Sequence, residues 1–180
     1  MKTQKRENEK MMYTTHYDSP LGDITIASDG ATLTGLWFDG QKYYAATLPD
    51  APLEKTDLPV FAETRRWLDL YFAGKCPYFT PPLAPTGTPF RQKVWNLLLD
   101  IPYGKTTTYG EIANRIVETF HVTSLHPIHM SPQAVGNAVG HNPISIIIPC
   151  HRVVGANGAL TGYAGGLERK AWLLQIERGF

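Results

Sequence analysis

The chain lacks the residues that mark secreted, zinc-binding or membrane proteins. Its 180 residues include only two cysteines, Cys76 and Cys150, so it has neither a disulfide framework nor a Cys-rich zinc pattern. No apolar run is long enough to cross a membrane, and the N-terminus lacks the apolar core of a signal peptide. We therefore expect a cytoplasmic protein, because a reducing compartment keeps a free thiol intact.

An excess of either charge is also absent. The sequence carries 17 Lys and Arg against 16 Asp and Glu, a formal net charge of +1, so whole-chain electrostatics select no polyanion partner. Residues 1–87 carry 9 basic and 11 acidic side chains, net −2, whereas residues 88–180 carry 8 and 5, net +3. The basic second half is compatible with nucleic acid and equally with ordinary charge scatter. With 43% hydrophobic and 18% charged residues, the composition predicts a folded protein.

The first half of the chain predicts a small α/β domain. Residues 1–10 are expected to be a mobile tail, residues 11–76 an N-terminal domain, and the Pro-rich residues 77–87 a linker running over the surface. Within this domain, an amphipathic helix is predicted at Leu58–Ala73. Three short strands are predicted at Tyr13–Tyr17, Asp23–Ser28 and Thr32–Phe38.

Residues 88–180 are predicted to form a second, mostly helical domain. Thr88 with Pro89 begins one helix, the capping box Thr108–Glu111 begins another near Tyr109–Phe120, and Leu167–Arg178 forms the last. This last helix is predicted to be amphipathic: Leu167, Ala171, Leu174 and Arg178 fall on one stripe, and Trp172, Leu173 and Ile176 flank it.

A third short helix, from Pro132 to about Gly140, presents almost no long side chains. Such a surface allows close approach to another helix, the commoner case, or to a groove. Together with Tyr109–Phe120 and the segment Val153–Leu160, it resembles a helix-turn-helix followed by a β-hairpin wing. The intervening residues 121–130 make a long connection with three histidines, either a solvated loop or, less favoured, a metal site.

A chemically distinctive segment places Cys150 between Pro149 and His151, at the end of an apolar run. Pro149 restricts the backbone of Ile148, so the chain enters Cys150 in a stiff conformation. A thiol reacts as thiolate, and a neighbouring imidazole can generate one. We therefore predict a nucleophile with a lowered pKa at Cys150 and an ordinary thiol at Cys76. The alternative is a small buried hydrophobic residue.

Several motifs in order resemble the O6-alkylguanine-DNA alkyltransferases. They are Ile101-Pro102-Tyr103-Gly104, Thr108-Tyr109, Ala134–Pro143, Pro149–Val154, Tyr163–Leu167 and Lys170–Leu174. The resemblance covers most of residues 88–180 and extends more loosely, through Ser19-Pro20-Leu21-Gly22, to the first domain. It implies an α+β fold: a small antiparallel sheet with a helix, ribonuclease H-like, followed by a winged helix-turn-helix domain.

The resemblance also implies a function. Such proteins repair DNA by direct reversal, moving an alkyl group from O6 of guanine to their own cysteine, once and irreversibly. The damaged nucleotide is flipped out of duplex DNA through the minor groove, because its O6 cannot otherwise reach a buried thiol. We expect double-stranded DNA as the partner, no cofactor, no metal, no membrane and a monomer. Activity toward O4-alkylthymine stays open.

The family motifs assign roles to residues of this chain. Cys150 would be the nucleophile, His151 would take its proton, through a water if the geometry requires one, and Glu177 would orient His151. Asn142 would fix the turn that presents Cys150, and Tyr109 would face the guanine and donate to it. The DNA-binding residues would be Gln133, Ala134, Val135, Gly136, Asn137, Tyr109 and Arg152. The base pocket would include Val139, Val153, Tyr163 and Ala164.

The chain departs from the family pattern at one position, and three other functions remain open. Gln133 stands where the family often carries an intercalating arginine. Taken alone, Tyr109 is a packing residue, Glu177 a solvated charge and Asn142 a turn former. The competing functions are a non-catalytic sensor of alkylated bases, a winged-helix regulator and a cysteine hydrolase. Stoichiometry separates them, because only the repair protein accepts one alkyl group per molecule.

Overall fold

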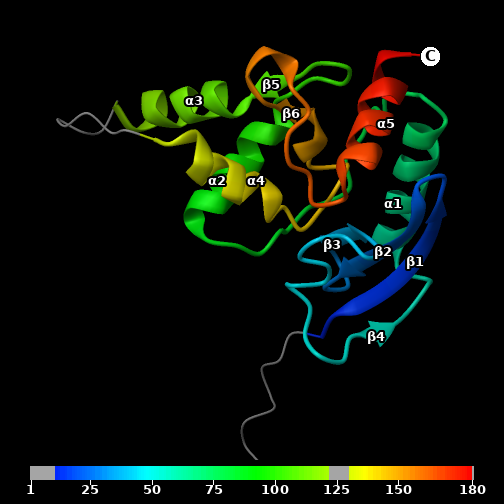
Figure 1. Ribbon diagram of the computed structural model, residues 1–180. Helices are drawn as coiled ribbons and strands as arrows, with labels where there is room; N and C mark the ends of the chain where they lie inside the picture. The colour runs from blue at the N-terminus through cyan, green and yellow to red at the C-terminus, as the bar shows by residue number, and fades with distance from the viewer. Residues whose placement is uncertain (1–10, 122–129, 180) are drawn as a thin grey trace, which may run out of the picture.

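The computed structural model describes residues 11–121 and 130–179 and shows a mixed α+β architecture (Figure 1). A sheet with one helix forms the first half of the chain, and a group of helices forms the second. The α+β fold predicted from the sequence is therefore confirmed. The expected tail at residues 1–10 lies outside the described residues, as does most of the histidine-containing segment. None of the helices in the described ranges is both long and apolar enough to span a bilayer.

The N-terminal sheet is an antiparallel meander with one short parallel strand added. Its strands are β1 (Tyr13–Ser19), β2 (Gly22–Ser28), β3 (Leu33–Phe38) and β4 (Leu53–Glu54), in the order β3-β2-β1-β4. The first three agree with the sequence prediction, whereas the two-residue β4 was too short to predict. Helix α1 (Pro59–Phe72) buries Phe61, Leu68 and Tyr71 in the same apolar cluster that contains Ile24 and Ile26 of β2.

The outer edge of β3, the strand at one end of the sheet, is covered by two segments from distant parts of the sequence. Leu33 exchanges backbone hydrogen bonds with Pro82 and Ala84, at 2.7 and 2.8 Å. Leu36 does the same with Pro143 and Ser145, at 2.8 Å each. Residues 82–84 are therefore more than a connector over the surface, because they pair with the sheet and cover half of its edge.

The second half contains helices α2 (Pro89–Leu99), α3 (Tyr109–His121), α4 (Pro132–Gly140) and α5 (Leu167–Arg178). The predicted caps are present: Thr88 Oγ1 accepts from the Arg91 amide, and Thr108 and Glu111 form a reciprocal capping box. Helix α4 packs against both α2 and α3, and the Trp95 indole donates to the Ala138 carbonyl over 2.8 Å. Its small residues thus serve close internal packing on one side.

The β-hairpin wing expected at Val153–Leu160 does not form. Strand β6 (Val153–Val154) pairs in parallel with β5 (Thr107–Thr108), and the short 3-10 turn η2 (Ala156–Gly158) follows. Asn157 and Gly158 both adopt positive φ, which turns the chain tightly after Gly155. After this turn, the Gly155 amide donates a hydrogen bond to the Ala159 carbonyl at 2.8 Å, and no strand follows among the described residues.

The last helix buries only one member of the predicted stripe, Leu174, together with the predicted flanking residues Leu173 and Ile176. Leu167 is 47% exposed, and Ala171 and Arg178 also face solvent. The buried residues of α5 are Lys170, Leu173, Leu174, Ile176 and Glu177. Their spacing follows the helical repeat, but two of them are charged. A hydrophobic pattern could not reveal this face, because it is polar at both ends.

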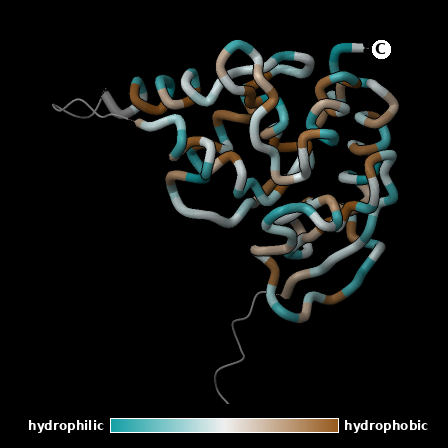
Figure 2. Tube along the Cα trace, viewed as in Figure 1, coloured by the Kyte–Doolittle hydropathy of each residue, from teal (hydrophilic) through white to brown (hydrophobic). Residues whose placement is uncertain are grey.

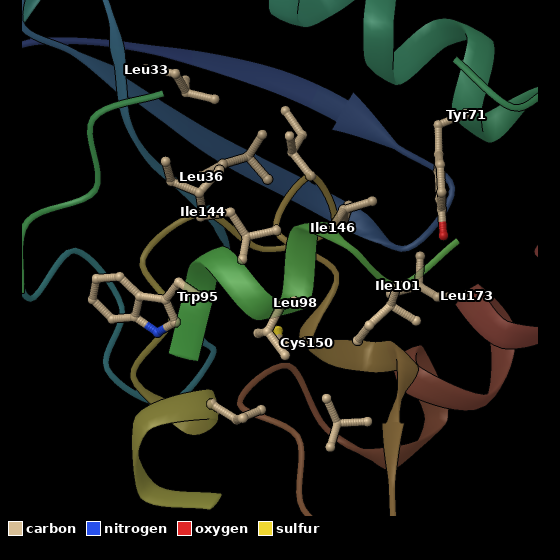
Figure 3. Packing of buried hydrophobic residues seen from close by; sticks show 14 of the residues in the cluster. Leu33, Leu36, Tyr71, Trp95, Leu98, Ile101, Ile144, Ile146, Cys150 and Leu173 are labelled. Carbon is tan, nitrogen blue, oxygen red and sulfur yellow. The ribbon is translucent and has the colours of Figure 1, made fainter. Parts of the chain in front are cut away.

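One apolar core joins the two halves. Leu36 from the sheet, Leu98 from α2 and Ile144 from the turn before Cys150 belong to the same buried cluster (Figure 3). Hydrophobic residues accordingly concentrate between the elements and hydrophilic ones toward the outside (Figure 2). The sheet is therefore packed against the helices that carry the site described next.

Candidate active site

Cys150 lies at a cavity of about 330 Å³, built from both halves of the chain. Its walls come from a loop after β3, the start of α3, helix α4 and the segment before α5. The lining residues are Lys42, Tyr43, Tyr109, Gly136, Asn137, Val139, Gly140, His141, Cys150, Gly162, Tyr163 and Ala164. A thiol at the base of a concave, partly aromatic cavity can meet a small planar ligand.

A tight turn presents the thiol to this cavity. The Asn142 side chain crosses the turn: Nδ2 donates to the Ile144 and Ile148 carbonyls, and Oδ1 accepts from the Ile144 amide. Ile146 inside the turn has a φ of 68°, a strained conformation for a β-branched residue. The three bonds of Asn142 hold this strained backbone and so fix the start of η1 (Cys150–Arg152).

The N-terminal sheet holds the other side of the same turn. Gln41, just after β3, accepts the Phe38 amide at 2.9 Å and the Ser145 hydroxyl at 3.2 Å through one oxygen. With the pairing of Leu36 to Pro143 and Ser145, the sheet thus positions Cys150 from outside its own domain.

His151 is completely buried and bonded to Glu177. Its Nε2 lies 2.6 Å from Glu177 Oε1, and both side chains are inaccessible to solvent. An ionised carboxylate only accepts hydrogen bonds, so Nε2 carries the proton and Nδ1 is left as an acceptor. Nδ1 is buried and has no hydrogen-bonding partner within the described residues.

This environment keeps the imidazole neutral. Burial lowers the pKa of His151, the charges of Arg152 and Lys170 lower it further, and Glu177 opposes them. A neutral imidazole with a free Nδ1 lone pair can accept a proton from a neighbouring thiol. The base role expected for His151 stays a prediction, and the structure adds the tautomer in which it would act.

Arg152 does not fit the DNA-binding role predicted for it. Only 8% of the residue is exposed, and its guanidinium donates to both oxygens of Glu177, at 2.8 Å from Nε and 3.0 Å from Nη2. Nη1 donates to the Ile101 carbonyl at 2.6 Å. A guanidinium held in this way by a buried carboxylate is committed to the fold of the site.

Glu177 is a carboxylate surrounded by donors. In addition to His151 and Arg152, it accepts from the Gly104 amide at 3.0 Å and from the Tyr71 hydroxyl at 2.7 Å. Burial alone would raise the pKa of Glu177, but the hydrogen bonds from His151 and Arg152 and the charge of Arg152 outweigh it and lower the pKa to about 2. Glu177 is therefore ionised throughout the neutral range.

The lowered pKa predicted for Cys150 is wrong for this structure. Burial raises its pKa, and the Asn142 side chain and the charge of Lys170 offset this only in part. The physical reason is that His151, its neighbour in sequence, bonds to Glu177 and is neutral, so it supplies no positive charge to the thiolate. Cys150 is therefore a buried, protonated thiol before substrate binds. Cys76, by contrast, is exposed to solvent.

Lys170 was not singled out as a site residue in the sequence, yet it organises one wall. It is fully buried and donates to three carbonyls, those of Val153, Thr161 and Gly162, at 2.6, 2.8 and 3.1 Å. Burial lowers its pKa to about 8. It ties β6 to the cavity wall and occupies the Val153 carbonyl. Val153 itself is buried and does not line the cavity, contrary to the prediction.

The remaining predicted residues divide between cavity, surface and core. Tyr109, Val139, Tyr163 and Ala164 line the cavity, as do Gly136 and Asn137 of α4. The Tyr109 hydroxyl donates to the Thr161 carbonyl at 3.3 Å. Gln133 is exposed and Ala134 half-buried in the first turn of α4. Val135 is fully buried, so its side chain faces the core and cannot contact DNA as predicted.

Sequence reasoning missed the contribution of the loop after β3. The Tyr43 ring stacks on His141 with centroids 3.9 Å apart, and the Lys42 amide donates to the Ala164 carbonyl at 2.9 Å. These contacts place the N-terminal loop at the cavity, but no motif in the loop signals it. Among residues 11–121 and 130–179, no three His, Cys, Asp or Glu side chains gather as metal ligands do.

The ionic core of the site generates a stability prediction. Glu177→Gln should lower the free energy of unfolding by roughly 2–4 kcal/mol, because it leaves the buried Arg152 without its carboxylate. Glu168→Gln on the exposed face of α5 is the control and should change stability by less than about 0.5 kcal/mol. Urea denaturation at pH 7 measures both. Equal stability of the two variants would show that Glu177 carries no net ionic stabilisation.

The same carboxylate sets a pH dependence of stability. The pKa of Glu177 is about 2 in the folded state, below its ordinary value near 4.3, so its contribution is complete above the unfolded pKa and lost as pH falls toward about 2. The destabilisation caused by Glu177→Gln should therefore shrink progressively below about pH 4.

Comparison with known proteins places this geometry in a family. Residues 12–85 match the ribonuclease-like domain of 6-O-methylguanine DNA methyltransferase, and residues 89–179 match its DNA binding domain. A methylated-DNA–protein-cysteine methyltransferase of Haemophilus influenzae is 44% identical over 169 residues, covering 93% of this chain and 87% of that protein. One from Methanosarcina acetivorans is 45% identical over 167 residues, covering 92% and 98%.

Solved structures agree with the sequence relatives. The crystal structure of Mycobacterium tuberculosis O6-methylguanine methyltransferase aligns with a TM-score of 0.77 at 42% identity, covering 93% of each chain. A structure of the Mycobacterium tuberculosis protein in complex with DNA aligns with a TM-score of 0.75, also at 42% identity, covering 93% of this chain and 92% of that one. The chain therefore belongs to the 6-O-methylguanine DNA methyltransferase family.

Proposed function

We propose that this chain repairs alkylated DNA by moving an alkyl group from O6 of guanine to Sγ of Cys150, irreversibly and once per molecule. The observation that carries the proposal is the placement of Cys150 at a cavity, next to a buried neutral His151 whose Nδ1 is free to accept a proton. The cavity is near the lower end of the range of about 300–1,000 Å³ typical of small-molecule sites, which suits a single base. The names of the relatives support the same chemistry.

The proposed reaction balances with the residues at hand. The Cys150 thiol gives its proton to His151 Nδ1, and sulfur attacks the alkyl carbon as the carbon–oxygen bond breaks. The electron pair of that bond stays with guanine, which gains a proton in turn. Tyr109 can supply it, because burial raises the pKa of its hydroxyl and keeps it protonated at neutral pH. His151 then releases its proton to solvent and Tyr109 takes one back from solvent, so the step ends with neutral guanine, a neutral imidazole and a protonated Tyr109.

A raised thiol pKa fits a reaction of this kind. Desolvation raises the pKa of Cys150, so the thiolate forms only when His151 accepts the proton. The thioether product has no good leaving group, so hydrolysis of the carbon–sulfur bond has no easy course. The alkylated protein is therefore a dead end, which gives a stoichiometry of one.

The DNA-binding part of the proposal uses the exposed side of α4. Gln133 and Asn137 face solvent, and the half-buried Gly136 lies beside the Tyr109 ring. A helix with so little bulk can enter the minor groove, and an extruded guanine would then reach the cavity beside it. The buried Val135 supports this surface from inside. The chain would act on double-stranded DNA as a cytoplasmic monomer without a cofactor.

The domain division proposed from the sequence also bears on DNA binding. We take residues 11–76 as the N-terminal domain, 77–87 as the linker and 88–180 as the domain that carries catalysis and DNA contact. The two family matches, which meet between residues 85 and 89, support this division.

The identity of the acceptor gives the first functional test. Incubation with a duplex that contains O6-methylguanine should add one methyl group to Cys150, and repair should stop after one equivalent. Intact-protein and peptide mass spectrometry measure both. Cys150→Ser should accept nothing, while Cys76→Ser should behave as wild type, because Cys76 is exposed and does not line the cavity. Many turnovers by the wild type would indicate a hydrolase, and methyl transfer by Cys150→Ser would remove Cys150 from the mechanism.

The position of Gln133 gives the second. Gln133→Ala should slow repair in duplex DNA more than in single strands, because only a duplex has a stack to hold open after the base leaves it. The free O6-alkylguanine base should react unchanged, and Gln133→Arg should keep or improve duplex repair. Single-turnover rates on the three substrates decide the matter, with the exposed Gln175→Ala on α5 as control. Equal slowing on all three would assign Gln133 to the fold or the cavity.

A further inference from the structure

One side chain from the N-terminal half reaches the His151–Glu177 pair. Tyr71 near the end of α1 is fully buried, and its hydroxyl donates to Glu177 Oε1 at 2.7 Å. The same hydroxyl lies 3.3 Å from His151 Nε2. Figure 3 shows Tyr71 extending away from α1, toward the region of Ile101 and Leu173. A residue 80 positions before His151 is thus a direct neighbour of the proposed base.

We propose that Tyr71 is a positioning residue for alkyl transfer: its hydroxyl shares Glu177 Oε1 with His151 and limits how strongly that carboxylate can hold the proton-bearing imidazole. The proposal rests on the proposed function, in which His151 accepts the Cys150 proton. It gives the N-terminal domain a role in the chemistry, in addition to its contacts with the turn before Cys150.

The number of donors around Glu177 supports this role. Oε1 accepts from His151 Nε2, Arg152 Nη2 and Tyr71 Oη, and Oε2 accepts from Arg152 Nε and the Gly104 amide. A carboxylate offers about four lone-pair sites, so five donors saturate it. On Oε1, a bond to Tyr71 therefore competes with the bond to His151. The competition matters most when His151 is protonated, since the imidazolium then needs the strongest acceptor.

The proposed role of Tyr71 depends on its hydroxyl and not on its ring. The Tyr71 ring stacks on Trp67 with centroids 5.3 Å apart and meets the Tyr103 ring edge-on at 6.0 Å. A phenylalanine would keep both contacts. Burial, followed by the charge of Glu177, raises the pKa of Tyr71 far above its ordinary value, so the hydroxyl remains a donor at every pH used in an assay.

Charged and polar groups from three elements surround His151 and set its protonation. Glu177 and Lys170 approach it from α5, Arg152 and Cys150 from η1, and Tyr71 from α1. Tyr103, after α2, is next to the Tyr71 ring and within the field of Glu177 and Arg152. The two cations disfavour the imidazolium and only Glu177 favours it. Removal of the Tyr71 hydroxyl leaves the cations unchanged and frees Oε1 for His151, which stabilises the imidazolium.

The sign of the effect follows from this balance. His151 accepts the thiol proton only when it is neutral, so the reaction is lost as pH falls through the pKa of His151 in the folded protein. A more stable imidazolium raises that pKa. Tyr71→Phe should therefore move the acid limb of the rate profile upward, on the order of half a pH unit. At high pH, where His151 is neutral in both proteins, the rates should converge to within about threefold.

The experiment uses the full chain in a Cys76→Ser background, so that Cys150 is the one thiol that reacts. Two profiles are measured from pH 4.5 to 9: single-turnover methyl transfer from an O6-methylguanine duplex, and alkylation of Cys150 by iodoacetamide. Tyr17→Phe is the matched control, because the Tyr17 hydroxyl donates to a carboxylate of the same helix, Asp69, and not to Glu177. Circular dichroism and thermal melting verify that each variant is folded.

The outcomes separate the proposals. An upward shift of the limb in Tyr71→Phe, with Tyr17→Phe unshifted, is the expected result, and adding Tyr71→Phe to Glu177→Gln should then give no further upward shift. A uniform loss of rate with an unmoved limb, or a downward shift, would overturn the role of Tyr71. If the wild type transfers no methyl group while the acid limb of the iodoacetamide profile still shifts in Tyr71→Phe, the proposed function fails. The effect of the Tyr71 hydroxyl on the protonation of His151 then still stands.

Discussion

The site depends on one buried carboxylate. Glu177 joins the last helix to Tyr71 of α1, to Gly104 after α2 and to His151 and Arg152 of η1. Five hydrogen bonds outweigh the desolvation that would otherwise neutralise it, so the charge persists in the interior. Without this anion, Arg152 would be an unpaired buried cation and His151 would lose the partner that defines its tautomer. Stability and reactivity therefore share the same interactions.

A second constraint fixes the thiol rather than the base. The turn before Cys150 contains a strained Ile146, held by Asn142 from within and by β3 and Gln41 from outside. The strain is tolerated because the surrounding bonds over-determine the backbone. As a result, Cys150 is presented at the cavity as a thiol with a raised pKa, and in the proposed mechanism the neutral His151 imidazole activates it. A thiol with a raised pKa reacts slowly with electrophiles other than the bound substrate, because little thiolate is present at neutral pH.

Much of this arrangement could be predicted from the sequence because it is local. The strands β1–β3, the helices and their caps follow from apolar periodicity and from residues such as Thr88, Pro89 and Glu111, which act within one turn of where they stand. The Pro149–Val154 motif likewise identified Cys150 and His151. The wing was mispredicted although Asn157 and Gly158 suit a hairpin turn, because the buried Lys170 takes the carbonyls of Val153 and Thr161 and so ties both segments to its own ammonium group.

What the sequence could not predict are the contacts made across the fold. Lys170 and Glu177 look like solvated charges of an amphipathic helix, yet both are buried, because carbonyls and cations from other elements surround them. Arg152 follows the catalytic pair and suggested a DNA contact, but its partner is 25 residues away. Tyr71 and Tyr43 belong to the other half of the chain and carry no motif. Only tertiary structure brings them to the cavity.

Before substrate binds, His151 is neutral, with its proton on Nε2 and its lone pair on Nδ1. Nitrogen-15 NMR of histidine-labelled protein at pH 7, with His151 assigned through a His151→Gln variant, measures this directly. We expect a protonated Nε2 and an unprotonated Nδ1, without titration at neutral pH. A protonated Nδ1, or an imidazolium at pH 7, would contradict it, because His151 could then accept no proton from Cys150.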